Sequence, residues 1–208
     1  MKLSHRLTCY LLVLSLWSTP AIGEAQTAFE RPDETWLVAD ITVPTIVDTF
    51  ALMEVNRWPQ AARGIRLAYR TPMEPRASFD VFVYPVNATG GIPEEQLANE
   101  YDAARDEVTL YARHGRENIE ITALEESEVS VETSEGLVFN GFQAEMSFDR
   151  EGDLLRSLLL VFKKDDYFIK YRLTHQPHLR ERLEAPIQAL LEASLSRIQL
   201  PMVEPTAP

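Results

Sequence analysis

The sequence predicts an α+β fold in which an antiparallel β-sheet is flanked by helices. Short runs of alternating apolar and polar side chains are joined by turn-like segments, which favours hairpins over the long crossovers of parallel sheets. Two other segments have the apolar period of a helix, so the order along the chain is strands, helix, strands, helix. This order is typical of an antiparallel sheet with helices packed on one or both of its faces.

The strand predictions depend on side-chain alternation and on the turn residues between the runs. The predicted strands cover residues 50–56, 65–69, 78–84, 119–123, 128–132, 138–148, 154–162 and 167–174. The run LLRSLLLVF within residues 154–162 is apolar on both faces apart from Arg156 and Ser157. A strand of this kind needs packing above and below, so we expect it in the interior of the sheet.

The first helix is predicted to start at Pro93 and to end before Gly115. Proline suits the first helical position, and Glu94 and Glu95 favour the positive end of the helix dipole. A single apolar stripe follows at steps of four and three residues, formed by Leu97, Tyr101, Ala104, Val108 and Tyr111.

The second helix is predicted between residues 178 and 198. Its apolar stripe consists of Leu179, Leu183, Ile187, Leu190, Leu191, Leu195 and Ile198. Pro186 lies inside this stripe, where a proline costs about 3 kcal/mol in a straight helix. We therefore expect a break or a kink between Leu183 and Ile187.

The chain begins with the features of a secretory signal peptide. Lys2 and Arg6 give a positive start, and the apolar run LTCYLLVLSLW is too short to span a bilayer as a mature helix. Small residues follow, and we expect cleavage after Gly23, with Ala25 as a second choice. The mature protein is then expected to be periplasmic or secreted, without a stable membrane span.

Cleavage divides the remaining chain into three predicted parts. Residues 24–44 form an N-terminal leader, residues 45–199 a single α+β domain, and residues 200–208 a disordered proline-rich tail. The mature chain keeps 18 basic and 32 acidic residues, a net charge of −14. Nucleic acid and anionic membrane surfaces need clustered positive charge, so we expect neither as a partner. The single cysteine, Cys9, leaves with the signal, which excludes thiolate and disulfide chemistry.

Two strand phrases, FDVFVYP at residues 79–85 and YFIKYRLT at residues 167–174, carry a resemblance to known proteins. With the order of elements around them, they resemble a group of uncharacterised secreted proteobacterial proteins. The architecture is similar to the α/β/α sandwich of the extrinsic photosystem protein PsbP and its relatives. The resemblance covers residues 45–199 and implies a non-enzymatic domain that docks onto larger assemblies or helps to assemble them. It carries no functional residue onto this sequence.

The segment from His175 to His178 has the spacing of an H-x-x-H metal pair. A zinc site needs one or two further ligands, and Pro177 keeps His175 out of the following helix. His114 is a distant candidate for a third ligand, and nothing in the sequence brings it close. We predict no metal and no cofactor, and we interpret the segment as a polar corner between strand and helix.

Motifs for nucleophilic catalysis are missing from the sequence, which has no G-x-S-x-G elbow and no mature cysteine. The acidic run LEESEVSVETSE at residues 124–135 is long enough to hold a catalytic pair of carboxylates. It is more typical of a charged, solvated strand edge, which discourages aggregation between sheets. We predict that the chain is not an enzyme.

Basic side chains gather near the last predicted strand of an otherwise acidic chain. The predicted binding residues are Lys170, Arg172, His175 and Arg180, with Lys163, Lys164 and Arg182 close by in sequence. Such a cluster suits an acidic envelope protein or an anionic ligand, for example a glycan or a lipid head group. The alternative is a polar sheet face whose lysines and arginines pair with neighbouring acids.

These observations predict an exported, non-enzymatic binding or assembly module of the bacterial cell envelope. They do not predict its oligomeric state. A periplasmic hydrolase and a small-ligand carrier are the alternatives. Convergent acids in a pocket, or a histidine–carboxylate pair beside a serine, would indicate the hydrolase. An apolar cavity between sheet and helix would indicate the carrier.

Overall fold

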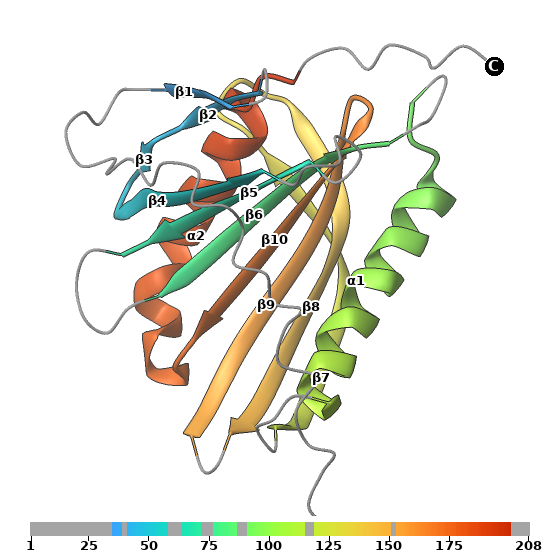
Figure 1. Cartoon of the computed structure of the whole chain (residues 1–208), viewed down its shortest axis with the longest axis vertical. Helices are drawn as coiled ribbons and strands as arrows, with labels where there is room; N and C mark the ends of the chain where they lie inside the picture. The colour runs from blue at the N-terminus through green and yellow to red at the C-terminus, as the bar shows by residue number, and fades with distance from the viewer. Residues whose placement is uncertain are drawn as a thin grey trace, which may run out of the picture.

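The computed structural model describes residues 35–38, 41–57, 64–71, 77–86, 91–114, 119–150 and 153–200. The strands are β1 (Thr35–Val38), β2 (Ile41–Pro44), β3 (Ile46–Val47), β4 (Phe50–Arg57), β5 (Ile65–Arg70), β6 (Ser78–Pro85), β7 (Ile119–Glu132), β8 (Val138–Arg150), β9 (Asp153–Lys164) and β10 (Tyr167–His175). The helices are α1 (Glu94–His114) and α2 (Arg180–Arg197), with a short 3-10 turn, Pro177–Leu179, before α2 (Figure 1).

Eight strands form one twisted sheet in the order β3-β4-β5-β6-β10-β9-β8-β7, and all of its pairings are antiparallel. The predicted antiparallel sheet with two helices is therefore confirmed. The last strand, β10, lies between β6 and β9, so it joins the early hairpins to the later meander. The apolar strand β9 lies in the interior of the sheet, as its sequence predicted.

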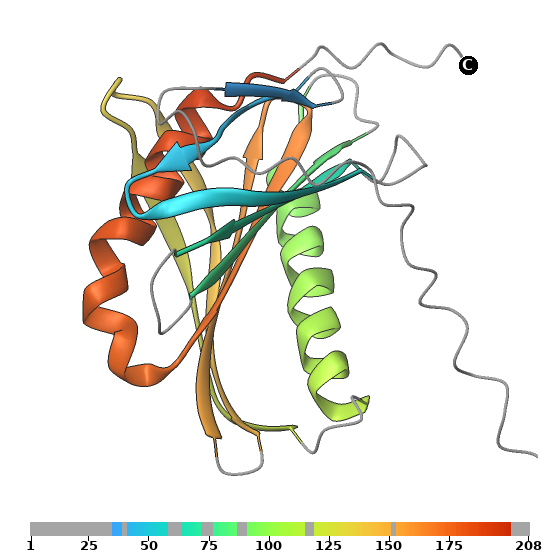
Figure 2. The same cartoon turned by 60° about the vertical axis from the view of Figure 1, so that its left-hand side comes forward.

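Two apolar cores lie on opposite faces of the sheet. In β9, Leu160 and Phe162 belong to the core that includes α2, whereas Leu159 and Val161 belong to the core that includes α1. Figure 2 shows the same arrangement, with α2 on one side of the strands and α1 on the other. Helix α1 packs over β7, β8 and β9, and among the described residues no helix covers the β4–β5 side of that sheet face.

Strand β7 is one strand, whereas the sequence predicted two short strands at residues 119–123 and 128–132. It is continuous from Ile119 to Glu132, with a register irregularity between Ile121 and Ala123. The strand forms one edge of the sheet, and Glu125, Glu126 and Glu128 are exposed on it. The acidic run is therefore a charged strand edge, as the sequence indicated.

The predicted leader is corrected by the structure at its C-terminal end. Strands β1 and β2 pair with each other, and Ile41 and Val43 of β2 are buried in the core of the α2 face. The amides of Thr42 and Gln199 donate to each other's carbonyl oxygens at 3.1 and 3.2 Å. The folded part thus begins before residue 45. The predicted signal peptide and the tail beyond Leu200 lie outside the described residues.

Helix α2 continues through Pro186 without the predicted break. Its axis curves over the sheet in Figure 2. The curve agrees with a kink, the second of the two predicted effects of the proline. Buried Leu183 and Leu190 lie on either side of the proline and hold the helix on the sheet. Their packing offsets the hydrogen bond that Pro186 cannot donate.

Candidate functional site

The four predicted binding residues do not form one site. On β10, Tyr171 and Leu173 point into the core of the α2 face, so Lys170 and Arg172 lie on the opposite face. His175 and Arg180, in contrast, both line a groove beside α2. Whether any of them binds a partner stays a prediction, but it now concerns two separate surfaces.

Lys170 holds α1 against the sheet. Its ammonium lies 3.3 Å from Glu107 of α1 and 5.1 Å from the ring centroid of Phe82. The side chain is only 15% exposed, which is low for a lysine. These contacts satisfy Lys170 within the protein and leave little of it for a partner.

The two lysines at the end of β9 secure helix ends. Lys163 donates to Glu94 at 2.5 Å and to the Ile92 carbonyl oxygen at 3.0 Å, beside the start of α1. Lys164 donates to the carbonyl oxygens of Leu195 and Ile198 at 2.5 and 2.7 Å, at the end of α2. A cation near the last carbonyls complements the helix dipole. Much of the predicted basic cluster is therefore structural.

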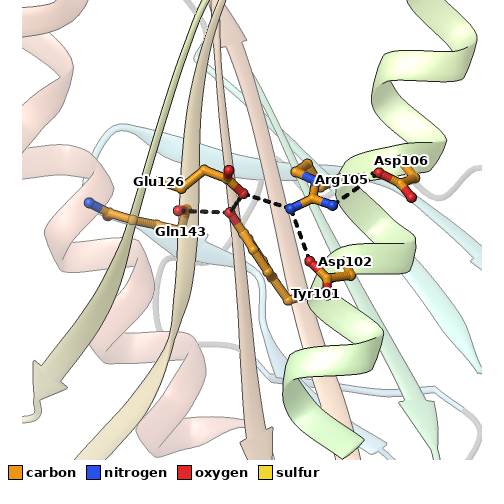
Figure 3. Close-up of polar contacts among 6 residues, drawn as sticks. All are labelled: Tyr101, Asp102, Arg105, Asp106, Glu126 and Gln143. Carbon is orange, nitrogen blue, oxygen red and sulfur yellow. Dashed lines mark hydrogen bonds and ion pairs between the residues drawn. The ribbon is translucent and has the colours of Figure 1, made fainter. Parts of the chain in front are cut away.

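A polar network joins α1 to β7 and β8 (Figure 3). Tyr101 donates to Glu126 Oε1 at 2.7 Å, with the Gln143 carbonyl oxygen 3.1 Å away, and Arg105 donates to the same carboxylate oxygen at 2.9 Å. Arg105 also pairs with Asp102 and Asp106 on α1, at 2.9 and 3.2 Å.

The pKa directions in this network indicate a structural clamp. Hydrogen bonds from Tyr101 and Arg105 lower the pKa of Glu126. Burial, with the hydrogen bond to Glu126, raises the pKa of Tyr101. The carboxylate therefore stays charged and the phenol stays protonated around neutral pH, and neither is poised to exchange a proton.

A groove of about 610 Å³ lies between α2 and the β7–β10 part of the sheet. Its volume is within the range of about 300–1,000 Å³ that is typical of small-molecule sites. The apolar side chains along it are Val129, Val131, Leu158, Leu160, Leu173, Ala185, Ile187 and Leu191. The polar ones are Ser130, Gln143, Glu145, Arg156, Ser157, His175, Arg180, Glu181, Glu184 and Gln188.

Glu145 organises the polar part of the groove. Its Oε1 accepts hydrogen bonds from Arg156 of β9 and Arg180 of α2, both at 2.6 Å. Each arginine contacts it through one nitrogen, and a guanidinium carries five N–H donors, so further donors remain for a ligand. Acids and bases both line the groove, so it offers donors and acceptors with little net charge.

The histidine pair does not converge. His175 is buried at the end of β10, with Nδ1 2.8 Å from the Gln176 carbonyl oxygen, whereas His178 is exposed. Among the described residues, no group of three or more histidine, cysteine or carboxylate side chains is placed to hold a metal ion. This statement does not cover the side chain of His114, which is not among those that the structure describes.

Sequence reasoning missed Glu145 and did not connect Arg156 with Arg180. Arg156 already interrupted an otherwise apolar strand, which was a usable signal. The pairing of β8 with β9 supplies its partner, because Glu145 lies opposite Leu158, two residues along β9 from Arg156.

In the part of the chain that the structure describes, the fold is an eight-stranded antiparallel sheet with one helix on each face. It is similar to CyanoP, the cyanobacterial PsbP of Synechocystis sp. PCC 6803, at a TM-score of 0.48 and 10% identity over 82% of this chain and 96% of that one. It is also similar to PA94 from Pseudomonas aeruginosa, a protein of unknown function suggested to be a regulator. That match has a TM-score of 0.42 and 13% identity over 81% of this chain and 98% of that one.

These likenesses carry no information about function. No family model matches the sequence, and no curated protein matches it. In the part of the chain that the structure describes, no helix is both long enough and apolar enough to cross a lipid bilayer.

Proposed function

We propose that this chain is an exported, non-enzymatic binding module of the bacterial cell envelope that holds a small amphipathic ligand. The observation that carries the proposal is the groove beside α2, which has an aliphatic wall and a hydrogen-bonding network around Glu145. A ligand-sized hollow between sheet and helix favours the small-ligand carrier over a module that docks through a flat surface. The predicted membership in a group of secreted proteobacterial proteins with a PsbP-like α/β/α sandwich remains part of this proposal.

The ligand that suits the groove has an apolar body and an uncharged, hydrogen-bonding head. The body would lie against Val131, Leu158 and Leu160. The head would meet the spare donors of Arg156 and Arg180. A strongly anionic head fits less well, because Glu145, Glu181 and Glu184 also line the groove.

A hydrolytic function has less support. The Glu145 carboxylate is already engaged by the guanidinium groups of Arg156 and Arg180, each 2.6 Å from its Oε1. These contacts position the two arginines, which is a structural role for Glu145.

The binding test uses N-phenyl-1-naphthylamine, an uncharged apolar fluorophore. We expect saturable binding by the full-length mature protein and affinity about tenfold or more weaker for Leu158→Trp, because the indole would occupy the groove. Leu154→Trp is the matched control, since Leu154 lies on the same strand and the same face but outside the groove and is exposed. Equal affinity of the two variants, or no saturable binding by the parent, would exclude the groove as the site.

Export is tested separately. When the full chain is expressed in a Gram-negative bacterium, we expect the periplasmic fraction to contain protein whose N-terminal sequence starts at Glu24. The small residues before the predicted cleavage point are the reason for this expectation. Protein that keeps Met1, or that stays in the cytoplasm, would contradict the export proposal and leave the groove proposal intact.

A further inference from the structure

The sheet face that carries Arg172 also holds two arginines around one aspartate. Asp80 of β6 accepts hydrogen bonds at the same oxygen, Oδ1, from Arg66 at 3.0 Å and from Arg70 at 3.1 Å. Arg66 and Arg70 lie on β5, four residues apart, so their side chains leave the same face of the strand. All three side chains are mostly buried, between 17% and 28% exposed.

Arg172 adds a third guanidinium to this group. It lies directly opposite Asp80 in the pairing of β10 with β6, and opposite residues in an antiparallel pair have Cβ atoms about 5 Å apart. Arg172 is partly buried, and within the described ranges its guanidinium group forms no hydrogen bond or ion pair. Among the described residues it is therefore a cation beside the Asp80 pair with no ion-pair partner of its own.

The group has more positive than negative charge. In the part of the chain that the structure describes, three guanidiniums face one carboxylate, and a second acid, Glu54, is half exposed with its Oε2 3.9 Å from Arg66. This excess occurs in a chain whose net charge is −12. Like charges held together away from water repel each other, and a bound anion would relieve that repulsion.

We propose that Arg66, Arg70 and Arg172 form a binding site for a phosphate-type oxyanion, either free or as part of a larger ligand. Guanidinium groups match the oxygen geometry of phosphate and bind it through paired N–H donors. Asp80 orders two of the arginines through a single oxygen, and their remaining donors are left for the anion. The site lies on the face opposite the groove and does not depend on it.

The test measures binding of inorganic phosphate by titration calorimetry at constant ionic strength, with the full mature protein. Arg172→Gln is expected to bind phosphate about tenfold or more weakly, the effect of losing charged hydrogen bonds, and Arg66→Gln should weaken binding as well. Because Arg172 has no ion pair to lose, Arg172→Gln should melt at the parent temperature. Arg182→Gln, which removes an exposed arginine of α2, is the matched control and should bind as the parent does.

Vesicles distinguish the two sources of the phosphate group. If vesicles of phosphatidylglycerol bind the parent but not Arg172→Gln, and phosphatidylcholine vesicles bind neither, the anion is a lipid head group. If only inorganic phosphate binds, the site takes the free ion or a soluble phosphate ester. No phosphate binding by the parent at about 10 mM, or equal binding by Arg172→Gln and Arg182→Gln, would overturn the proposal.

Discussion

Leu160→Ala is expected to lower the free energy of unfolding by about 2–5 kcal/mol. Leu160 is 2% exposed and packs in the core of the α2 face, with Phe162 on the same strand and Tyr171 on β10. Truncation removes buried methyl groups and leaves a cavity that the paired strands cannot close. Urea unfolding followed by circular dichroism measures the loss, provided the denaturant dependence stays unchanged.

Leu158→Ala is the matched comparison, because Leu158 lies two residues away on the same face of β9. It is only partly buried, in the wall of the groove, so less than half of the Leu160 effect is expected. The sequence treats the two leucines alike, and only the structure separates them. A loss below about 1 kcal/mol for Leu160→Ala would mean that α2 does not cover this strand.

The core of the fold was predictable because the spacing of apolar residues along a strand or helix indicates which of its faces is buried. The alternation of Phe79, Val81 and Val83 marked β6, and the stripe that includes Leu97 and Val108 marked α1. These patterns are local, so they need no knowledge of the partner strands. The spacing of apolar residues matches the burial of their side chains wherever one side of a strand or helix faces a core.

The edges of the fold were less predictable, since other forces hold them. The acidic middle of β7 lacks strict alternation because it is exposed at the sheet edge, and pairing with β8 keeps it extended. Strands β1 and β2 are short, and β2 is held by Gln199, more than 150 residues away. Interactions over such separations leave no period in the local sequence.

The candidate sites also have one part that the local sequence predicts and another that depends on distant residues. Residue parity on β10 could have shown that Lys170 and Arg172 face away from His175, since successive strand residues alternate. The partners that complete each surface come from distant strands. Arg66 and Arg70 join Arg172 only through the sheet order, and Glu145 joins Arg180 only through the packing of α2.

Gly141 of β8 is a glycine whose replacement should disturb the pairing of β8 with β9. A Cβ placed there would lie 2.3 Å from the Val161 carbonyl oxygen and 2.6 Å from the Phe162 Cδ1 atom of the neighbouring strand. The oxygen is backbone within a paired strand, so it cannot turn aside as a flexible side chain would. Gly141 therefore lets β8 and β9 approach closely under the Phe162 ring.

Gly141→Ala is expected to lower the free energy of unfolding by about 3 kcal/mol or more, since the strands must separate or shift to admit the methyl group. Gly136→Ala is the control. Gly136 has a φ of +76° and no atom within 4 Å of an added Cβ, so only the left-handed strain of about 1–2 kcal/mol applies. Urea unfolding of both variants compares a steric clash with backbone strain. Equal losses would show that β8 and β9 are further apart at this point.

The same substitution should also affect the groove. Glu145 is four residues beyond Gly141 on β8 and meets Arg156 of β9 at 2.6 Å, a contact that depends on the β8–β9 register. Strands pushed apart at Gly141 would draw Glu145 away from Arg156 and widen the groove wall. In the N-phenyl-1-naphthylamine titration, we therefore expect folded Gly141→Ala to bind more weakly than the parent, and Gly136→Ala to bind equally well. Unchanged binding by Gly141→Ala, together with its lower stability, would show that the groove tolerates movement between these two strands.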